Sequence, residues 1–135
     1  METKVVLHGA HTCELIHLAS NSRFFTDSPA SLGGAGSYFA PTDLIGAALA
    51  SCVLTQMADA AHRRGIRLHS GQAGVSKTMS SSPRRITAIR IDIALPAELS
   101  ADELTVLREA AVGCPVHQTL VASAIAITIN FGTLP

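Results

Sequence analysis

The sequence has few aromatic residues and no tryptophan, since Phe, Trp and Tyr together make up 4% of its 135 residues. Hydrophobic residues nevertheless reach 47% of the chain. The core must therefore be built from aliphatic side chains and alanine. A chain of this length is long enough to bury a sizeable core, and we predict a single domain over residues 1–135.

Neither sign of charge is in excess, because ten Lys and Arg balance ten Asp and Glu. Nucleic-acid-binding domains normally carry clustered positive charge, so we expect no nucleic-acid partner.

Long hydrophobic runs are also lacking. The longest, from Leu44 to Leu54, is interrupted by Gly46 and Ser51 and is shorter than the roughly 20 residues that span a bilayer. We therefore expect no membrane partner.

The first residues, Met-Glu-Thr-Lys-Val, lack the basic and apolar segments of a signal peptide, so the cytoplasm is the expected location. Structural disulfides are rare in that reducing compartment, where paired cysteines are more often catalytic, redox-sensing or metal-binding. Cys13, Cys52 and Cys114 show no CxxC spacing. We accordingly predict no metal site and no cofactor.

Short β-prone runs and alternating apolar residues predict six strands, with turns rich in Gly, Ser and Pro between them. The expected strands cover residues 5–8, 15–18, 24–27, 67–79, 86–95 and 124–131. Three helices interrupt this series. The order is typical of an α+β fold with antiparallel sheets and a helical layer.

The clearest helix runs from Pro41 to about Arg64. Proline suits a first helical turn, Asp43 complements the positive end of the helix dipole, and Gly65 ends the helix. Between Leu44 and Leu54 the helix is apolar nearly all round. Such a helix is buried on most faces, or buried between two subunits.

Two shorter helices are expected in the second half of the chain. Ser100 and Glu103 have the spacing of a capping box, which opens a helix over residues 101–111. Cys114 and Pro115 interrupt, and a short helix then runs to about residue 122.

Two of the cysteines occupy chemically different positions. Cys52 lies in the middle of the long helix, where apolar surroundings raise a thiol pKa and favour an inert core residue. Cys114 precedes a helix, where backbone N–H groups and the helix dipole favour a thiolate. His117, one turn later, could add positive charge or move a proton. At this point inert thiols and a reactive pair both remain open.

Four charged residues are further candidates for a site. Arg23 is the best-placed cation before the long helix, although it could simply face water from a strand. Asp43 is a first-turn helix charge that could also orient an arginine. Arg63 and Arg64 are more typical of solvated charges at a helix end.

Three segments together resemble the OsmC/Ohr family. Residues 33–66, GGAGSYFAPTDLIGAALASCVLTQMADAAHRRGI, resemble its glycine-containing loop, proline and long helix bearing one cysteine. Residues 107–120, LREAAVGCPVHQTL, are similar to its second cysteine site, and the terminal AIAITINF is similar to its last strand. The resemblance covers essentially the whole chain.

The resemblance implies an OsmC-like α+β fold in which two subunits intertwine as a homodimer and their long cysteine-bearing helices pack together. It also implies the reduction of organic hydroperoxides. Cys52 would be the peroxidatic thiol and Cys114 the resolving thiol, which converts a Cys52 sulfenic acid into a disulfide. A dithiol or a lipoylated protein would then reduce that disulfide.

In peroxidase members of the family, an N-terminal arginine faces the thiolate and is held by a glutamate ten positions before the cysteine. Here that position is Thr42, and the neighbouring acid is Asp43. Arg23, the first arginine in the chain, is our candidate to stabilise the thiolate in place of the family's arginine, with His11 as another. Asp43 would then orient Arg23.

Two other functions stay open. In the first, a non-enzymatic protein binds a small hydrophobic ligand in the cleft between its subunits, with the cysteines as redox sensors or packing residues. In the second, the thiols ligate a metal.

Overall fold

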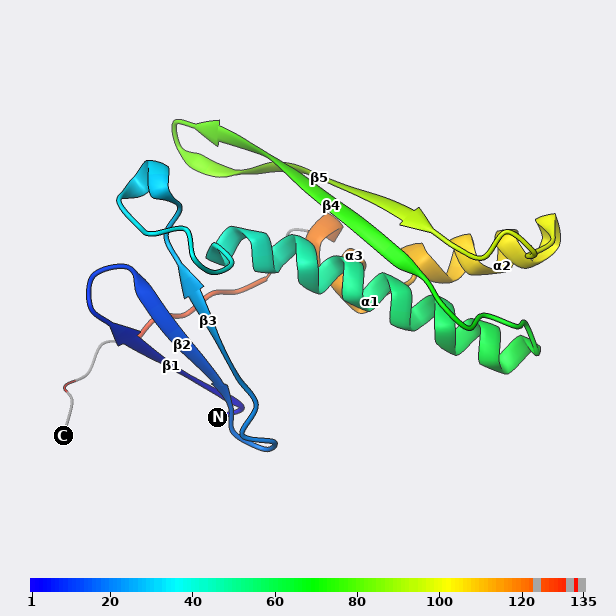
Figure 1. Cartoon of the computed structure of the whole chain (residues 1–135), viewed down its shortest axis with the longest axis horizontal. Coiled ribbons are helices and arrows are strands. Elements are labelled where there is room, and N and C mark those ends of the chain that lie inside the picture. The colour runs from blue at the N-terminus through cyan, green and yellow to red at the C-terminus, as the bar shows by residue number, and fades with distance from the viewer. Residues whose placement is uncertain (123–124, 131–132, 134–135) are drawn as a thin grey trace. The chain divides into compact units, whose positions relative to one another are not determined.

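The structure is a computed structural model that describes residues 1–122, 125–130 and 133. It has the α+β architecture predicted from the sequence, with two antiparallel sheets and three α-helices among the described residues (Figure 1). The elements are β1 (Thr3–His8), β2 (Thr12–His17), β3 (Arg23–Asp27), the 3₁₀ helix η1 (Ala30–Leu32), α1 (Pro41–Arg64), β4 (Gln72–Ser81), β5 (Arg84–Ala94), α2 (Ala101–Val112) and α3 (Pro115–Ala122).

The chain forms two compact units. The strand unit comprises Met1–Ala50 and Ala73–Ile93, and the helix unit comprises Ser51–Gln72 and Ala94–Pro135. Single-domain organisation stays a prediction, and the two units are described separately below.

The first sheet of the strand unit has the order β1-β2-β3, with both pairs antiparallel. The central strand β2 places Ile16 opposite Lys4 of β1 and Arg23 of β3. Ile16 is buried, whereas Val5 and Leu7 of the edge strand β1 remain exposed. The three predicted N-terminal strands are therefore confirmed, and β1 and β2 each begin before the predicted first residue.

A buried aspartate organises the loop between β3 and α1. Asp27 is only 3% exposed, and its Oδ2 accepts hydrogen bonds from the backbone N–H groups of Ala35 and Ser37 at 3.2 and 3.3 Å. Gly34 approaches Ser28 so closely that a Cβ at this position would lie 1.8 Å from the Ser28 carbonyl oxygen. A side chain is therefore excluded there, and the loop conformation depends on glycine.

Both ends of α1 are capped as the sequence predicts. At the start, the Ala40 N–H donates to Asp43 Oδ2 at 2.9 Å, which satisfies a backbone donor that no helix bond reaches. At the end, Gly65 has a φ of +66°, and the Ile66 N–H donates to the Ala61 carbonyl at 2.9 Å. This pattern is a Schellman motif, in which glycine takes the left-handed conformation without a steric cost.

The second sheet is the hairpin β4–β5, which packs against the first turns of α1 within the strand unit. Gly46 makes this approach possible, because a Cβ there would lie 2.7 Å from Val75 Cγ1. The predicted start of β4 at Arg67 is wrong, since the strand begins at Gln72. The cause is the helix cap, which uses the Ile66 N–H, followed by a turn in which the Leu68 N–H donates to the Ile66 carbonyl at 3.0 Å.

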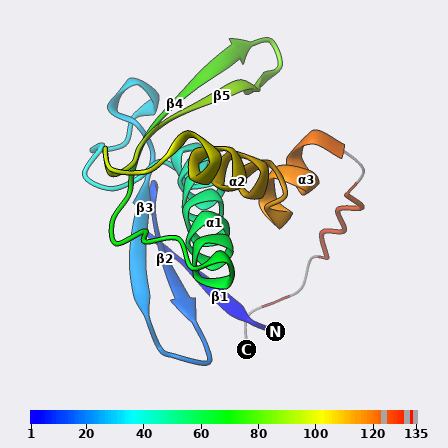
Figure 2. The same ribbon diagram turned by 90° about the vertical axis from the view of Figure 1, so that its right-hand side faces the viewer.

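The helix unit contains the second part of α1 together with α2 and α3 (Figure 2). The predicted capping box is present: the Ser100 N–H donates to Glu103 Oε2 at 2.8 Å, and the Glu103 N–H donates to Ser100 Oγ at 3.2 Å. Met57 and Ala61 of α1 and Leu107 of α2 are buried. The core is therefore aliphatic, as the composition requires.

The predicted C-terminal strand over residues 124–131 has no strand structure in its described part. Ala124 and Phe131 lie outside the described residues, and residues 125–130 have no strand structure. Their three isoleucines, Ile125, Ile127 and Ile129, are 62%, 80% and 73% exposed. Alternation describes only the side chains of a segment, whereas a strand also needs a neighbouring edge that accepts its backbone hydrogen bonds.

By length and composition alone, α1 is able to cross a membrane, which corrects the expectation that no segment qualifies. That expectation counted uninterrupted apolar residues, although a helix remains apolar on average across Gly46 and Ser51. Core helices of globular proteins meet the same criterion, and 39% of this apolar window is already buried within the chain. One such helix is therefore weak evidence for a membrane protein.

Replacing the buried aspartate of the loop should destabilise the protein. We expect Asp27→Ala to lower the free energy of unfolding by about 2 kcal/mol, because two backbone N–H groups lose a charged acceptor in a buried setting. Urea denaturation followed by circular dichroism would measure the change. The matched control is Asp59→Ala on the surface of α1, which should cost about 0.5 kcal/mol or less. Equal effects of the two substitutions would contradict this role of Asp27.

Candidate active site

Two of the three cysteines meet inside the helix unit. Cys52 lies in α1 and is half-buried, whereas Cys114 lies between α2 and α3 and is fully buried. Both thiols are free, and they lie close enough for Cys52 to influence the pKa of Cys114. Of the four predicted site residues, the structure thus brings together the two cysteines.

Local backbone structure fixes the Cys114 thiol in place. The residue caps α3: its Sγ accepts the His117 backbone N–H at 3.2 Å, and its carbonyl oxygen accepts the Gln118 N–H at 3.0 Å. The Gln118 side-chain amide then donates to the Val112 carbonyl at 2.7 Å and ties α3 to the end of α2. The sequence Cys-Pro-Val-His-Gln therefore supplies a helix cap as well as a thiol.

Burial raises the pKa of Cys114 above its ordinary value of 9.0. The hydrogen bond from the His117 backbone lowers this pKa, and the Cys52 thiol raises it further. The prediction that the helix start makes Cys114 a thiolate is therefore wrong. Loss of hydration outweighs the helix N–H groups, and Cys114 stays protonated at neutral pH.

His117 contributes more than its backbone N–H. Its ring Nδ1 is buried and has no hydrogen-bond partner among the described residues. Most buried polar atoms have a partner, so an exception of this kind calls for an explanation.

Arg23 is held within the first sheet. Its guanidinium donates to Glu14 Oε1 at 2.9 Å and to Asn21 Oδ1 at 3.1 and 3.3 Å. Glu14 also pairs with His8 at 3.1 Å. The hydrogen bonds that Glu14 receives from His8 and Arg23 lower its pKa below the ordinary value. Glu14 was not predicted as a site residue. It could have been identified from the strand register, which places it diagonally across the β2–β3 pair from Arg23.

Asp43 does not orient Arg23 in this structure. It forms an ion pair with Lys77 of β4 and accepts the Ala40 N–H that begins α1. Nine residues of helix turn through roughly 900°, so Asp43 and Cys52 lie on opposite sides of α1, about 13.5 Å apart along its axis. Lys77 could not be identified as the partner of Asp43 from the sequence, because only the packing of the hairpin brings the two residues together.

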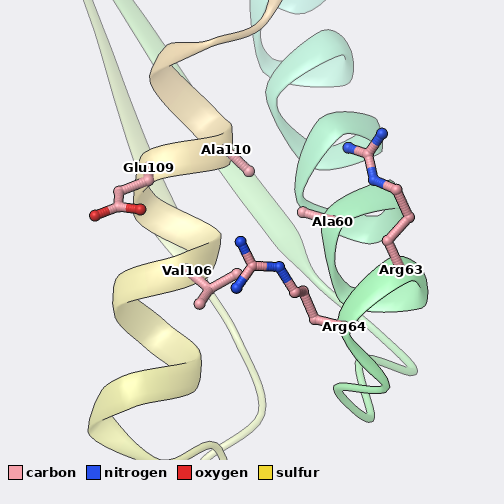
Figure 3. Close-up of a pocket in the computed structure, with 6 residues that line it drawn as sticks. All are labelled: Ala60, Arg63, Arg64, Val106, Glu109 and Ala110. Carbon is pink, nitrogen blue, oxygen red and sulfur yellow. The ribbon is translucent and has the colours of Figure 1, made fainter.

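Arg63 and Arg64 border a groove of about 290 Å³ between α1 and α2, lined also by Ala60, Val106, Glu109 and Ala110 (Figure 3). Arg63 pairs with Asp59 one turn earlier at 2.9 Å, as expected of an exposed helix-end charge. Arg64 reaches across toward Val106, while Glu109 points away from both arginines. The groove lies about 18 Å along α1 from Cys52 and is separate from the thiol pair.

An apolar pocket of about 250 Å³ lies beside the second part of α1. Its lining consists of Leu54, Thr55, Ala58, Leu68, His69, Ser70, Gly71 and Leu95. Within the part of the chain that the structure describes, no cluster of three or more His, Cys, Asp or Glu side chains is arranged to hold a metal ion.

The family model of OsmC-like proteins matches residues 34–130, a stretch that includes α1, both thiols and the cap of α3. The chain belongs to the OsmC family. A search of curated proteins finds no match.

Solved structures agree with this OsmC-family assignment. A Psychrobacter arcticus protein, named for osmotic stress induction and a detoxification response, is 34% identical with a TM-score of 0.84, over 88% of this chain and 87% of that one. An OsmC-like protein of Mycoplasma pneumoniae is 19% identical with a TM-score of 0.75, over 88% and 85% of the two chains. The organic hydroperoxide resistance protein OsmC of Legionella pneumophila is 20% identical with a TM-score of 0.62, over 89% of each chain. The last two show a shared fold.

The ion pair at the start of α1 should make the stability of this OsmC-family chain depend on acid. Lys77 holds the pKa of Asp43 below its ordinary value of 3.8, so the stabilisation is present above that value and is lost as pH falls through the folded-state pKa. We expect Lys77→Gln to lower the free energy of unfolding at pH 7 by less than about 1 kcal/mol, because both groups keep contact with water. Between pH 5 and pH 2, the free energy of unfolding should therefore fall by less in Lys77→Gln than in the wild type.

Urea denaturation across this pH range would test the role of the pair. The matched control is Lys4→Gln, an exposed lysine of β1 that should leave the acid dependence unchanged. If Lys77→Gln and the wild type lost stability in parallel as pH falls, the pair would not stabilise the folded state.

Proposed function

We propose that this protein reduces organic hydroperoxides with a pair of cysteine thiols, Cys52 as the peroxidatic residue and Cys114 as the resolving residue. The observation that carries the proposal is the proximity of these two free thiols in a chain of the OsmC family. Relatives whose names include organic hydroperoxide resistance support a redox role of this kind.

The proposed cycle balances with thiols alone. The Cys52 thiol releases its proton, the thiolate attacks the distal peroxide oxygen, and the O–O bond breaks; the departing alkoxide takes up that proton and leaves as an alcohol. The resulting sulfenic acid condenses with the Cys114 thiol to form a disulfide and water. An external dithiol, either a small molecule or a lipoylated protein, then reduces the disulfide by thiol–disulfide exchange.

Burial supports this division of roles between the thiols. Cys52 is half-buried, so a substrate can reach it. Cys114 is fully buried, and its raised pKa keeps it a thiol until an electrophilic sulfur forms beside it. The less accessible thiol therefore suits the second step.

The proposed thiolate still requires a nearby cation, and Arg23 remains our candidate. In the structure Glu14 holds Arg23, which is the orienting role that the resemblance assigned to Asp43. We therefore assign that support to Glu14. Asp43 instead secures the start of α1 through Ala40 and Lys77.

The face of α1 that carries Cys52 supports a homodimer. Ile45, Ala48 and Cys52 are spaced three and four residues apart and share this face, and Ile45 is 42% exposed in the single chain. A second copy packed here would bury the exposed apolar residues and enclose the thiol for an apolar substrate. We place this dimer in the cytoplasm, where a free thiol pair stays reduced.

One observation favours a second candidate function. The apolar pocket beside α1 has about the volume of a small organic molecule. His69 is the one titratable side chain in its lining. A non-enzymatic protein could bind a small hydrophobic ligand there, with the thiols as redox sensors or packing residues.

Substitution of the thiols should separate the two functions. We expect Cys52→Ser to abolish reduction of cumene hydroperoxide, because serine cannot form a sulfenic acid. Cys114→Ser should consume one equivalent of peroxide and accumulate a Cys52 sulfenic acid. Intact-mass analysis with a sulfenic-acid trap would measure both outcomes, with Cys13→Ser as the matched control.

The same experiment can rule out the peroxidase. Unchanged masses in folded wild-type protein after peroxide treatment would leave ligand binding as the function.

For Arg23→Gln, we expect slower formation of the sulfenic acid and normal conversion of that acid to the disulfide.

The proposed dimer makes a separate prediction. Ile45→Glu should halve the molecular mass measured by light scattering after size exclusion, because it places charge in an apolar contact near a two-fold axis. Leu18→Glu, at an exposed position after β2, is the matched control and should leave the mass unchanged. A wild-type protein that is monomeric at micromolar concentration would refute the dimer.

A further inference from the structure

We propose that the ring of His117 carries the proton that Cys114 releases when it condenses with the oxidised Cys52. This inference rests on the proposed peroxidase function and adds a residue to its second step. It also assigns a role to a buried nitrogen that otherwise lacks one.

The second step needs a base that the thiols do not supply. Cys114 is fully buried and protonated, yet it must attack as a thiolate. The hydrogen bond that its Sγ receives from the His117 backbone comes from a donor, which stabilises the anion but cannot accept a proton. Among the described residues, no hydrogen bond joins either Sγ to a carboxylate, lysine or arginine.

His117, three residues after Cys114, carries a ring nitrogen that can accept the proton. It belongs to the first turn of α3, so its own backbone holds the Cys114 sulfur at 3.2 Å. Its ring Nδ1 is buried without a hydrogen-bond partner in the described part of the chain. The neighbouring Gln118 side chain is already bound to the Val112 carbonyl and does not compete for this nitrogen.

Cys114, in the loop before α3, interacts with the Cys52 thiol from α1. An imidazole nitrogen can both take up and release a proton, which this step requires. The ring would reach the thiol through one water molecule or by a small rotation of its side chain.

Every proton in this step has a defined donor and acceptor. The S–H bond of Cys114 breaks and its proton passes to Nδ1, while the sulfur attacks the Cys52 sulfenic acid. The S–O bond breaks as the S–S bond forms, and the departing hydroxide takes the proton from the ring to leave as water. No further oxidant or reductant is needed.

The test is a comparison of His117→Phe with the wild type in rapid-quench experiments after one equivalent of cumene hydroperoxide. Trapped sulfenic acid measures the first step, and the Cys52–Cys114 disulfide measures the second, both by intact mass. We expect an unchanged first step and a roughly 10²-fold slower second step at pH 7. The rate of the second step should depend less on pH than in the wild type, and added imidazole should restore part of the rate.

Two further variants keep the result interpretable. His117→Gln retains a polar side chain without a titratable nitrogen, and it replaces the phenylalanine variant if that protein does not fold. His62→Phe, at an exposed position in the last turn of α1, is the matched control and should leave both steps unchanged.

The outcomes distinguish this inference from the function on which it rests. Wild-type rates and pH profile in both His117 variants would overturn the inference and leave the peroxidase standing. A slower second step with an unchanged pH profile and no imidazole rescue would show a packing role only, and would also overturn it. A wild-type protein that forms no disulfide would remove both proposals.

Discussion

The contact between the Cys52 and Cys114 thiols is the feature on which the rest of the site depends. It places a sulfur that is fully buried beside one that solvent can reach. Burial has a chemical consequence, because it keeps the inner thiol protonated despite the N–H groups of the helix that it caps. Any redox role for the pair must therefore include a way to remove one proton from the buried Cys114 thiol.

The position of Cys52 depends on how α1 is held at its two ends. The loop before it is fixed by Asp27 and by the close approach of Gly34 to Ser28, and the first turn by Asp43 with Lys77. At the other end Gly65 stops the helix. Several conspicuous polar residues thus have structural partners, so a charge near a cysteine in the sequence is poor evidence that it acts on that cysteine.

Most of the fold could be predicted from local signals. The capping box at Ser100, the glycine at position 65 and the strand alternation each act over a few residues, so the sequence displays them directly. The errors share one cause, which is that a partner distant in sequence decides the outcome. Residues 125–130 are not paired with a strand, and the thiolate expected at Cys114 is outweighed by burial among groups from other elements.

The α+β class, the helix limits and the family can be predicted from the amino-acid order alone, because caps, turns and periodic apolar residues are local properties of the chain. The same patterns identify Cys52 and Cys114 as candidate site residues. Three-dimensional packing was needed to show that these thiols lie close together, that Glu14 rather than Asp43 holds Arg23, and that Lys77 pairs with Asp43. Those facts depend on strand register and helix packing, which join residues far apart in sequence and leave no mark at either position.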